Sequence, residues 1–251
     1  QVIRLYRIPT ADAKVVCPPE RYELFPGGVM GNTLTGAARL GLDTGYIGKI
    51  GNDPFGAELV RLAEGDGVDL SACPVVKGER TAWTWIVVDD EGERTITLFP
   101  NVLSTVDEMF VREHESYIAG AKILHLEGSE MPLSPFIEAA RIARKHGVKV
   151  SFDLDIPASD VVEKLRLGTR EELYELIRLS DYFIPCIAGG AELVAAVGDG
   201  VPTPDEIALQ LRRRFGNEVV AVSHGAEGCF VSTEAKTFHS PAYEIRAVDG
   251  T

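Results

Sequence analysis

Residues 121–155 read AKILHLEGSEMPLSPFIEAARIARKHGVKVSFDLD, and this stretch decides the fold. An apolar run that ends near residue 127 and a second run over residues 148–155 have the length and composition of buried strands. Residues 134–147 between them are amphipathic and end in a cationic turn, which is typical of a helix. A strand, a helix and a strand in this order predict a parallel βαβ unit.

The same alternation continues toward the C-terminus. Helical patterns over residues 169–180 and 203–216 each lead into an apolar strand, at residues 181–185 and 218–225. Alternating helices and strands are typical of an α/β fold whose central sheet is mainly parallel.

Two further helices and a strand are predicted toward the N-terminus. Residues 32–40 predict a helix that Gly41 ends, and residues 44–51 predict a short strand. We expect Asp53 to cap the next helix, with Pro54 in its first turn. The apolar residues expected to share one face of each helix are Leu34, Ala37, Ala38 and Leu40 in the first, and Phe55, Leu59 and Leu62 in the second.

Residues 81–100 interrupt this alternation with two β-rich runs that flank a turn at residues 89–92. This pattern predicts an antiparallel hairpin, which suggests a small lid on a larger domain. Trp83 and Trp85 stand two positions apart on its first strand, so their side chains share one face of the hairpin.

Charge and composition exclude several classes of protein. The 251 residues include 25 Lys and Arg against 38 Asp and Glu, which gives a net charge of −13. Such a surface repels phosphate backbones and anionic lipids, so we expect neither nucleic acid nor a membrane as a partner. No apolar run approaches the roughly 20 residues that span a bilayer, and we expect a cytoplasmic location. The four cysteines and five histidines lack the spacing of a metal site or a redox pair.

Three glycine clusters lie at expected turns, over residues 27–32, 48–56 and 223–228. Each can be explained by a tight turn alone, since glycine tolerates a positive φ. None matches the GxGxxG pattern of dinucleotide-binding folds or the GxxxxGK[ST] pattern of P-loops, which disfavours both classes. His224 has no nearby Cys or Asp in the sequence, which disfavours a hydrolase triad.

Taken together and in this order, the segments resemble the PfkB family of carbohydrate kinases, which have the ribokinase-like fold. GGVMGN and IGKIGNDPFG are similar to the family's first signature region, and VVDDEGERTITLFPN is similar to its lid hairpin. KILHLEG, VSFDLD, DYFIP and AVSHGAEG fall where the family has successive core strands, and AVDGT at the C-terminus resembles the start of its second signature. The resemblance implies a single three-layer α/β domain over residues 1–251 with a small β lid at about residues 80–100.

The resemblance also implies an activity, the transfer of the γ-phosphoryl group of ATP to a hydroxyl of a small sugar or related polyol, with Mg²⁺ on the phosphates. The residues that it places at the substrate are Gly27, Gly28, Asn32 and Glu127. Those that it places at ATP are Ser223, Gly225 and Gly228, and those at a monovalent cation, K⁺, are Asp249 and Thr251. Glu127 is equally well explained as a solvated strand-end acid, and Asp249 as an Asx-turn residue.

The chain departs from the family pattern in two ways. The expected NxxE stretch reads CIAG at residues 186–189, and Glu192 is the nearest carboxylate. The family's first strand with its sugar-binding Asp is not matched, and its catalytic Asp would lie just beyond Thr251. We therefore name no catalytic residue and expect the chain as written not to turn over.

Several alternatives stay open. The acceptor can be a nucleoside, and the departures also allow a non-catalytic sugar- or nucleotide-binding protein of the same fold. A phosphorylated acceptor is disfavoured, because Lys49 and Arg80 are the only obvious cations near the glycine motifs. Trp83 and Trp85 can form either a wall over the sugar or a lid-to-lid interface, and we favour a homodimer through the lid.

Overall fold

The computed structural model describes residues 2–5, 8, 16–25, 27–90, 94–195 and 202–245. The chain divides into two compact units. The first unit is Gln1–Val106 with Ile245–Thr251, and the second is Asp107–Glu244. We describe each unit by itself, and the expected single domain stays a prediction. No helix in the described ranges is long and apolar enough to cross a membrane.

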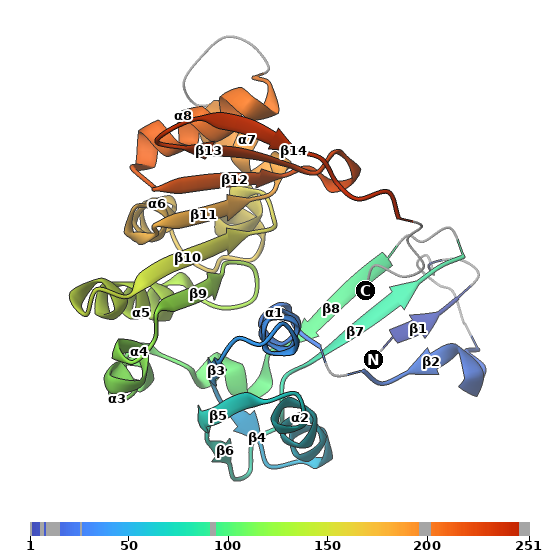
Figure 1. The fold of residues 1–251 in the computed structure, drawn as a ribbon. Helices are drawn as coiled ribbons and strands as arrows, with labels where there is room; N and C mark the ends of the chain where they lie inside the picture. Colours follow the sequence, from blue (N-terminus) through green and yellow to red (C-terminus); the bar gives the residue numbers. More distant parts are fainter. Residues whose placement is uncertain are drawn as a thin grey trace. The chain divides into compact units, whose positions relative to one another are not determined.

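The second unit is built on a six-stranded sheet in the order β14-β13-β12-β11-β10-β9 (Figure 1). Its strands are β9 (Ile123–Glu127), β10 (Lys149–Leu154), β11 (Tyr182–Pro185), β12 (Val219–Ser223), β13 (Cys229–Thr233) and β14 (Thr237–Ser240). The strands β9 to β12 are parallel to one another, and β13 and β14 add two antiparallel pairs. The predicted α/β class with a mainly parallel sheet is confirmed.

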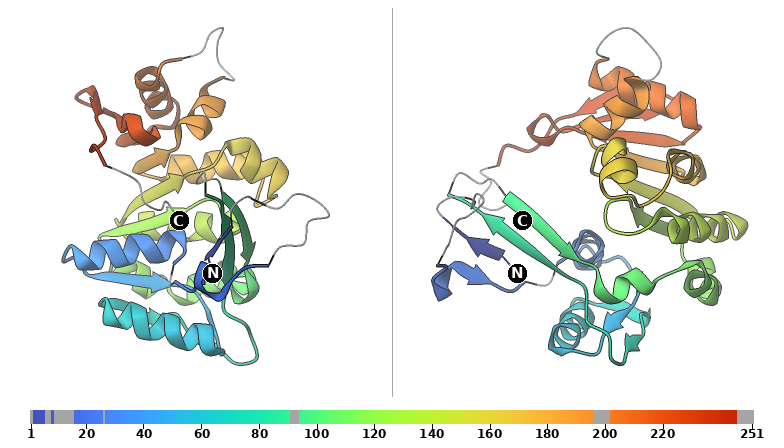
Figure 2. Two further views of the ribbon diagram at one scale, coloured as in Figure 1. Left: turned by 90° about the vertical axis from the view of Figure 1, so that its right-hand side faces the viewer. Right: turned by 180° about the vertical axis from the view of Figure 1, so that it is seen from behind.

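Among the helices of this unit, the last four contact the sheet, and the first two pack against the third (Figure 2). The helices are α3 (Glu108–Glu113), α4 (Glu115–Ala119), α5 (Leu133–Lys145), α6 (Arg170–Leu179), α7 (Ile187–Ala195) and α8 (Pro204–Phe215), with a π-helical turn at Asp160–Lys164. Thr169 and Thr203 begin α6 and α8 with capping boxes, in which the threonine hydroxyl accepts from the third helical amide. These caps explain why the two predicted helices begin where they do.

The core of the second unit follows from strand alternation. The side chains of Val150, Phe152, Phe183, Val220 and Val222 are fully buried, whereas their neighbours on the same strands are mostly only half-buried. Burying such a side chain contributes about 1.5–3 kcal/mol. One face of the sheet is therefore the hydrophobic core.

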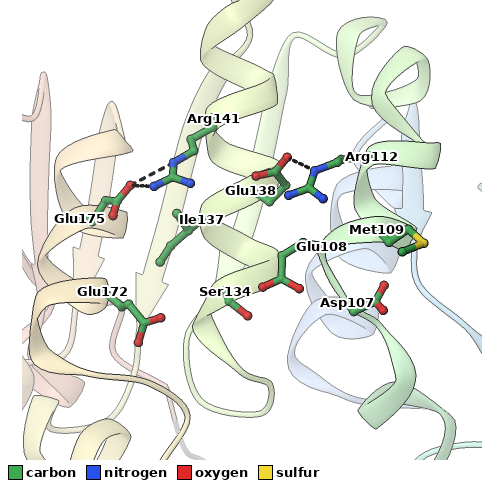
Figure 3. Close-up of a pocket in the computed structure, with 10 residues that line it drawn as sticks. All are labelled: Asp107, Glu108, Met109, Arg112, Ser134, Ile137, Glu138, Arg141, Glu172 and Glu175. Carbon is green, nitrogen blue, oxygen red and sulfur yellow. Dashed lines mark hydrogen bonds and ion pairs between the residues drawn. The ribbon is translucent and has the colours of Figure 1, made fainter.

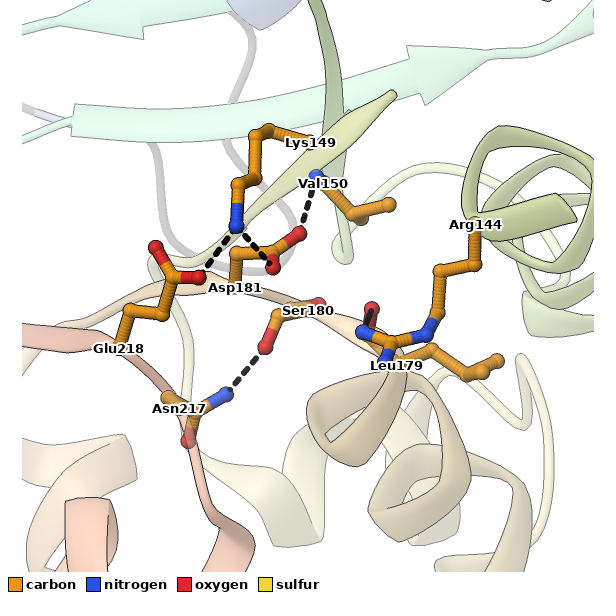
Figure 4. Close-up of polar contacts among 8 residues, drawn as sticks. All are labelled: Arg144, Lys149, Val150, Leu179, Ser180, Asp181, Asn217 and Glu218. Atoms are coloured by element: carbon orange, nitrogen blue, oxygen red, sulfur yellow. Dashed lines mark hydrogen bonds and ion pairs between the residues drawn. The ribbon is translucent and has the colours of Figure 1, made fainter. Parts of the chain in front are cut away.

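A polar network closes the edge where the parallel strands begin (Figure 4). Asp181, just before β11, accepts a hydrogen bond from the amide of Val150 at 2.8 Å and from Lys149 Nζ at 3.1 Å. Lys149 also pairs with Glu218, just before β12. The opposite edge, at the carboxyl ends of the same strands, is where open parallel sheets bind ligands.

The first unit contains a four-stranded sheet in the order β2-β1-β7-β8, with strands β1 (Val2–Arg4), β2 (Tyr22–Glu23), β7 (Trp83–Val88) and β8 (Arg94–Phe99). Its remaining strands form two short parallel pairs, β3 (Thr44–Ile47) with β5 (Val68–Ala72) and β4 (Ile50–Gly51) with β6 (Val75–Val76). Its helices are α1 (Val29–Arg39) and α2 (Pro54–Gly65), with 3₁₀ turns at Pro19–Arg21 and Asn101–Thr105. Figure 1 shows α1 in blue, α2 in teal and the strands β7 and β8 in blue-green.

The predicted hairpin is present, but it is not the whole of its sheet. The strands β7 and β8 pair antiparallel, and β1 adds to β7 in parallel, which the local pattern did not indicate. The predicted shared face of the two tryptophans is confirmed, since the ring centroids of Trp83 and Trp85 lie 6.1 Å apart. Trp83 also stacks on Phe99 with a centroid distance of 4.3 Å.

Two of the apolar residues expected on the faces of α1 and α2 are exposed, and one of them lies outside its helix. The helix α1 begins at Val29 and ends at Arg39, so Leu40 lies past its last turn and its residue surface is 85% exposed. Phe55 lies in the first turn of α2 and is 49% exposed. For Leu40 the reason is the helix boundary, which spacing alone does not fix to within one or two residues. For Phe55 the reason is that its side of the first turn of α2 is not covered.

Candidate functional site

Gly27 and Gly28 form the entry to α1, as the first glycine motif predicts. Gly28 is the residue before the helix and has φ 94°, a conformation that L side chains rarely adopt. Asn32 lies in the first turn, where its amide donates to the carbonyl of Gly28 at 2.9 Å. A Cβ added to Gly27 would lie 4.0 Å from Asn32 Oδ1, so the side chain of Asn32 turns back toward the glycines. All three residues are exposed, which leaves backbone amides and a carboxamide available to hydroxyl groups.

Glu127 ends β9 in the second unit and is only 2% exposed. Its Oε1 accepts a hydrogen bond from the amide of Ser129 at 2.7 Å. Burial is the main cause that raises the pKa of Glu127 to about 8, the charges of Asp155 and Glu130 add to it, and the hydrogen bonds from Ser129 oppose it. The alternative of a solvated strand-end acid is therefore wrong.

Sequence reasoning missed three further carboxyl groups beside Glu127. Asp153 is the register partner of Glu127 on β10, so the two side chains leave the same face of the sheet. Burial, and then the charge of Asp155, raise the pKa of Asp153 to about 6 and also raise the pKa of Glu130. The available signal was the pair of acids in VSFDLD, next to a strand end that was already under consideration.

This carboxyl cluster, defined as Glu127, Glu130, Asp153 and Asp155, is suited to neutral polar groups. A protonated carboxyl group both donates and accepts hydrogen bonds, as a sugar hydroxyl does. A further anion would add to the like-charge repulsion that already raises these pKa values.

The third glycine motif forms the turn between β12 and β13. Ser223 ends β12 and is exposed, and Gly225 begins a 3₁₀ turn with φ 50°. The turn is closed by the amide of His224, which donates to the carbonyl of Gly228 at 2.8 Å. A Cβ at Gly225 would meet nothing within 4 Å, so the turn leaves open space at Gly225.

Glu127 and Ser223 lie at the same edge of one sheet. Both end parallel strands, and β10 and β11 separate the two strands. Three inter-strand steps place these ends roughly 14 Å apart along the edge. Gly27, Gly28 and Asn32 belong to the first unit, and Asp249 and Thr251 lie outside the described residues.

Glu192, the carboxylate nearest the altered NxxE stretch, has a local partner. Its two oxygens accept from the amide and the hydroxyl of Ser159, both at 2.8 Å. Gly189 lies against the backbone, since a Cβ there would come 2.8 Å from the carbonyl oxygen of Ile156. Among the described residues no three His, Cys, Asp or Glu side chains are grouped so that they could hold a metal ion. We therefore assign no protein ligand to Mg²⁺ and derive no step through it.

A separate hollow of about 420 Å³ lies on the outer helices α3, α5 and α6 (Figure 3). Arg112 pairs with Glu138 at 2.6 Å and Arg141 pairs with Glu175 at 2.5 Å along its wall. None of the predicted site residues lines it. Exposed ion pairs of this kind are worth about 0–1 kcal/mol each, and we interpret the hollow as a gap between packed helices.

The fold and the strand-end groups define an α/β protein with polar side chains gathered at the carboxyl edge of a parallel sheet, the edge at which open sheets of this kind bind ligands. The family model described as pfkB family carbohydrate kinase matches residues 2–251, and the chain belongs to this family.

Known proteins agree with this assignment. The chain is 31% identical to ribokinase from Haemophilus influenzae, over 92% of this chain and 71% of that protein. It is 30% identical to ATP-dependent ribose-1-phosphate kinase from Halopiger xanaduensis, over 98% of this chain and 75% of that protein. The structure of ribokinase from Thermotoga maritima is similar with a TM-score of 0.81 at 21% identity, covering 100% of this chain and 76% of that chain.

Proposed function

We propose that this chain transfers the γ-phosphoryl group of ATP to a hydroxyl of a small, neutral sugar. The observation that carries the proposal is the match to the carbohydrate kinase family over residues 2–251. The carboxyl cluster supports an acceptor without a phosphate or carboxylate group, because a buried anion among carboxyl groups is costly.

In this proposal the protein acts mainly by positioning. ATP supplies the phosphoryl group, and Mg²⁺ bound with ATP would supply charge neutralisation there, for which no protein ligand is assigned. In the first unit, Asn32 and the amides at the start of α1 are suited to orient hydroxyl groups. In the second unit, Glu127 is suited to exchange hydrogen bonds with hydroxyl groups. Ser223 donates its hydroxyl to a phosphate oxygen, and the open space at Gly225 leaves room for the nucleotide. The space at Gly228 is taken by the backbone of Ser240 and Ala242, so the expected direct role of Gly228 at the nucleotide is replaced by a role in holding the turn.

The proposal is tested in a protein that carries the family's second signature in full, by the formation of ADP from ATP and Mg²⁺ with ribose, fructose, adenosine and ribose 1-phosphate as acceptors. We expect turnover with a neutral sugar and at least about tenfold lower kcat/KM with ribose 1-phosphate, which corresponds to about 1.4 kcal/mol. Asn32→Ala should raise the KM for the sugar. Absence of ADP with every acceptor would exclude the kinase, and preference for ribose 1-phosphate would exclude the neutral acceptor.

A second candidate is a protein that binds a sugar or nucleotide without turnover. The observation that favours it is that CIAG stands at residues 186–189 in place of the NxxE stretch. The nearest carboxylate, Glu192, already accepts two hydrogen bonds from Ser159. A thermal shift with sugar and with ATP, in the absence of ADP formation, would support this candidate over the kinase.

We further propose that the protein forms a homodimer through the four-stranded sheet of the first unit. Trp85 is 42% exposed beside the stacked rings of Trp83 and Phe99, and exposed aromatic faces favour a partner. Trp85→Glu is expected to convert the dimer to a monomer by light scattering, whereas Leu165→Glu, an exposed site in the second unit, should leave the mass unchanged. A Trp85→Glu protein that stays dimeric contradicts this interface.

The cytoplasmic location and the K⁺ site at Asp249 and Thr251 stay predictions. Activity measured in K⁺ against a large organic cation such as tetramethylammonium tests the second of these, since a specific site distinguishes the two ions at equal ionic strength.

A further inference from the structure

The lid, defined here as β7 and β8, is joined at its base to the start of α2 through Asp53. As predicted, Asp53 caps α2, and its Oδ1 accepts from the amide of Gly56 at 2.8 Å. The same oxygen accepts from the hydroxyl of Thr81 at 2.7 Å, and Oδ2 accepts from the amide of Thr81 at 2.9 Å. An ordinary cap uses one oxygen, whereas this carboxylate uses both.

Thr81 belongs to the base of the lid, two residues before β7, and is 5% exposed. The chain leaves the lid at Asn101, whose side-chain amide donates to the carbonyl of Thr81 at 2.9 Å. The amide of Val102 donates to the carbonyl of Arg80 at 3.1 Å, so both ends of the lid are tied together. Asn101 has φ 45°, which is unusual for a non-glycine residue and indicates that its surroundings fix it.

Two glycines allow this close approach. A Cβ at Gly51 would lie 2.2 Å from the amide nitrogen of Thr81, and a Cβ at Gly56 would lie 2.2 Å from the carbonyl oxygen of Gly51. The lid base therefore packs against one surface, formed by Gly51, Asp53 and Gly56. The glycines of the second motif allow this packing as well as the turn.

We propose that Asp53 is a positioning residue that anchors the lid, because its carboxylate holds the base of the lid to the first turn of α2. With the anchor intact, the lid base and α2 move as one body. Without it, the cap of α2 persists but the lid pivots about the link between Thr81 and Asn101. The kinetic consequence for the sugar rests on the proposed function, but the structural consequence does not.

The lid carries its own probe, since Trp83 and Trp85 are the 2 tryptophans of the sequence. Asp53→Asn keeps one acceptor oxygen for the cap and places an amide donor where another acceptor is needed. We expect at least about a twofold higher constant for acrylamide quenching and a lower fluorescence anisotropy, because side chains on a loosened element are more accessible and more mobile. Asp107→Asn is the matched control, because Asp107 caps α3 through a single hydrogen bond from the amide of Phe110 at 2.9 Å.

If Asp53→Asn does not fold, Thr81→Val and Thr81→Ser give the same test, since valine removes the hydroxyl donor and serine keeps it. Thr81→Val should raise the quenching constant and Thr81→Ser should restore it. With an active enzyme, the anchor variants should raise the KM for the sugar about tenfold while kcat changes less than threefold. Unchanged quenching and anisotropy in folded Asp53→Asn and Thr81→Val overturn the proposal. If no acceptor is phosphorylated, the fluorescence result still decides the anchor separately from the proposed function.

Discussion

Gly228→Ala is expected to lower the free energy of unfolding by at least about 4 kcal/mol, the range of severe single substitutions. Gly228 has φ 93°, and a Cβ there would lie 2.2 Å from the carbonyl oxygen of Ser240 and 2.6 Å from the amide nitrogen of Ala242. Both contacts are with backbone, so they can be relieved only by moving the segment after β14 away from the turn. Urea denaturation at constant pH measures the loss.

Gly216→Ala is the matched control for this prediction. Gly216 ends α8 with φ 82°, but a Cβ there would meet nothing within 4 Å. Alanine at this position should cost only the left-handed conformation, about 1 kcal/mol. An equal loss in both variants would show that backbone contact at the turn is unimportant. If Gly228→Ala is folded, it should also weaken the thermal shift given by ATP.

Glu127→Gln is expected to remove most of a pH dependence of stability. The folded protein holds the pKa of Glu127 at about 8, above the ordinary value of 4.5, so it binds this proton more tightly than the unfolded chain does. The stabilisation is therefore complete below about pH 4.5 and is lost as the pH rises toward 8. The glutamine variant should gain stability over wild type across this window, on the order of a few kcal/mol at its upper end.

Urea denaturation at several pH values between 4 and 9 tests this prediction. Asp153 contributes a slope of the same sign at lower pH, because burial and Asp155 raise its pKa to about 6. Asp153→Asn should therefore flatten the lower part of the curve and Glu127→Gln the upper part. Glu64→Gln, an exposed site on α2, is the control. A Glu127→Gln curve parallel to that of wild type would contradict a buried, protonated carboxyl group.

Most of the second unit could be predicted from the sequence because its order is local. The caps at Thr169 and Thr203, the amphipathic pattern of α5 and the strand-length apolar runs all act within one element. What could not be predicted depends on pairing. Asp153 joins Glu127 through the register of two strands, and no periodicity within either strand indicates this.

The predicted roles of the site residues divide in the same way. Gly28 and Gly228 both have a positive φ, which glycine adopts readily, so the glycines in the sequence were enough to predict these turns. The second role of Asp53 depends on a partner 28 residues away, Thr81, and only its helix cap was foreseen. Long-range contacts of this kind carry the anchor and the carboxyl cluster, which are the features most relevant to function.

The pairing of β1 with β7 also constrains how the protein reaches its fold. Val2 pairs with Ile86, so about 80 residues of chain must be made before β1 and β7 can pair. Closing the long loop between them costs conformational entropy, which slows folding. During synthesis β1 can pair with β2 on one side, but its other side stays open to pairing with another chain until β7 is made. The single sheet of the second unit pairs strands that lie much closer in the sequence, so its assembly has no such delay. We therefore expect the first unit to be the slow and aggregation-prone step of folding.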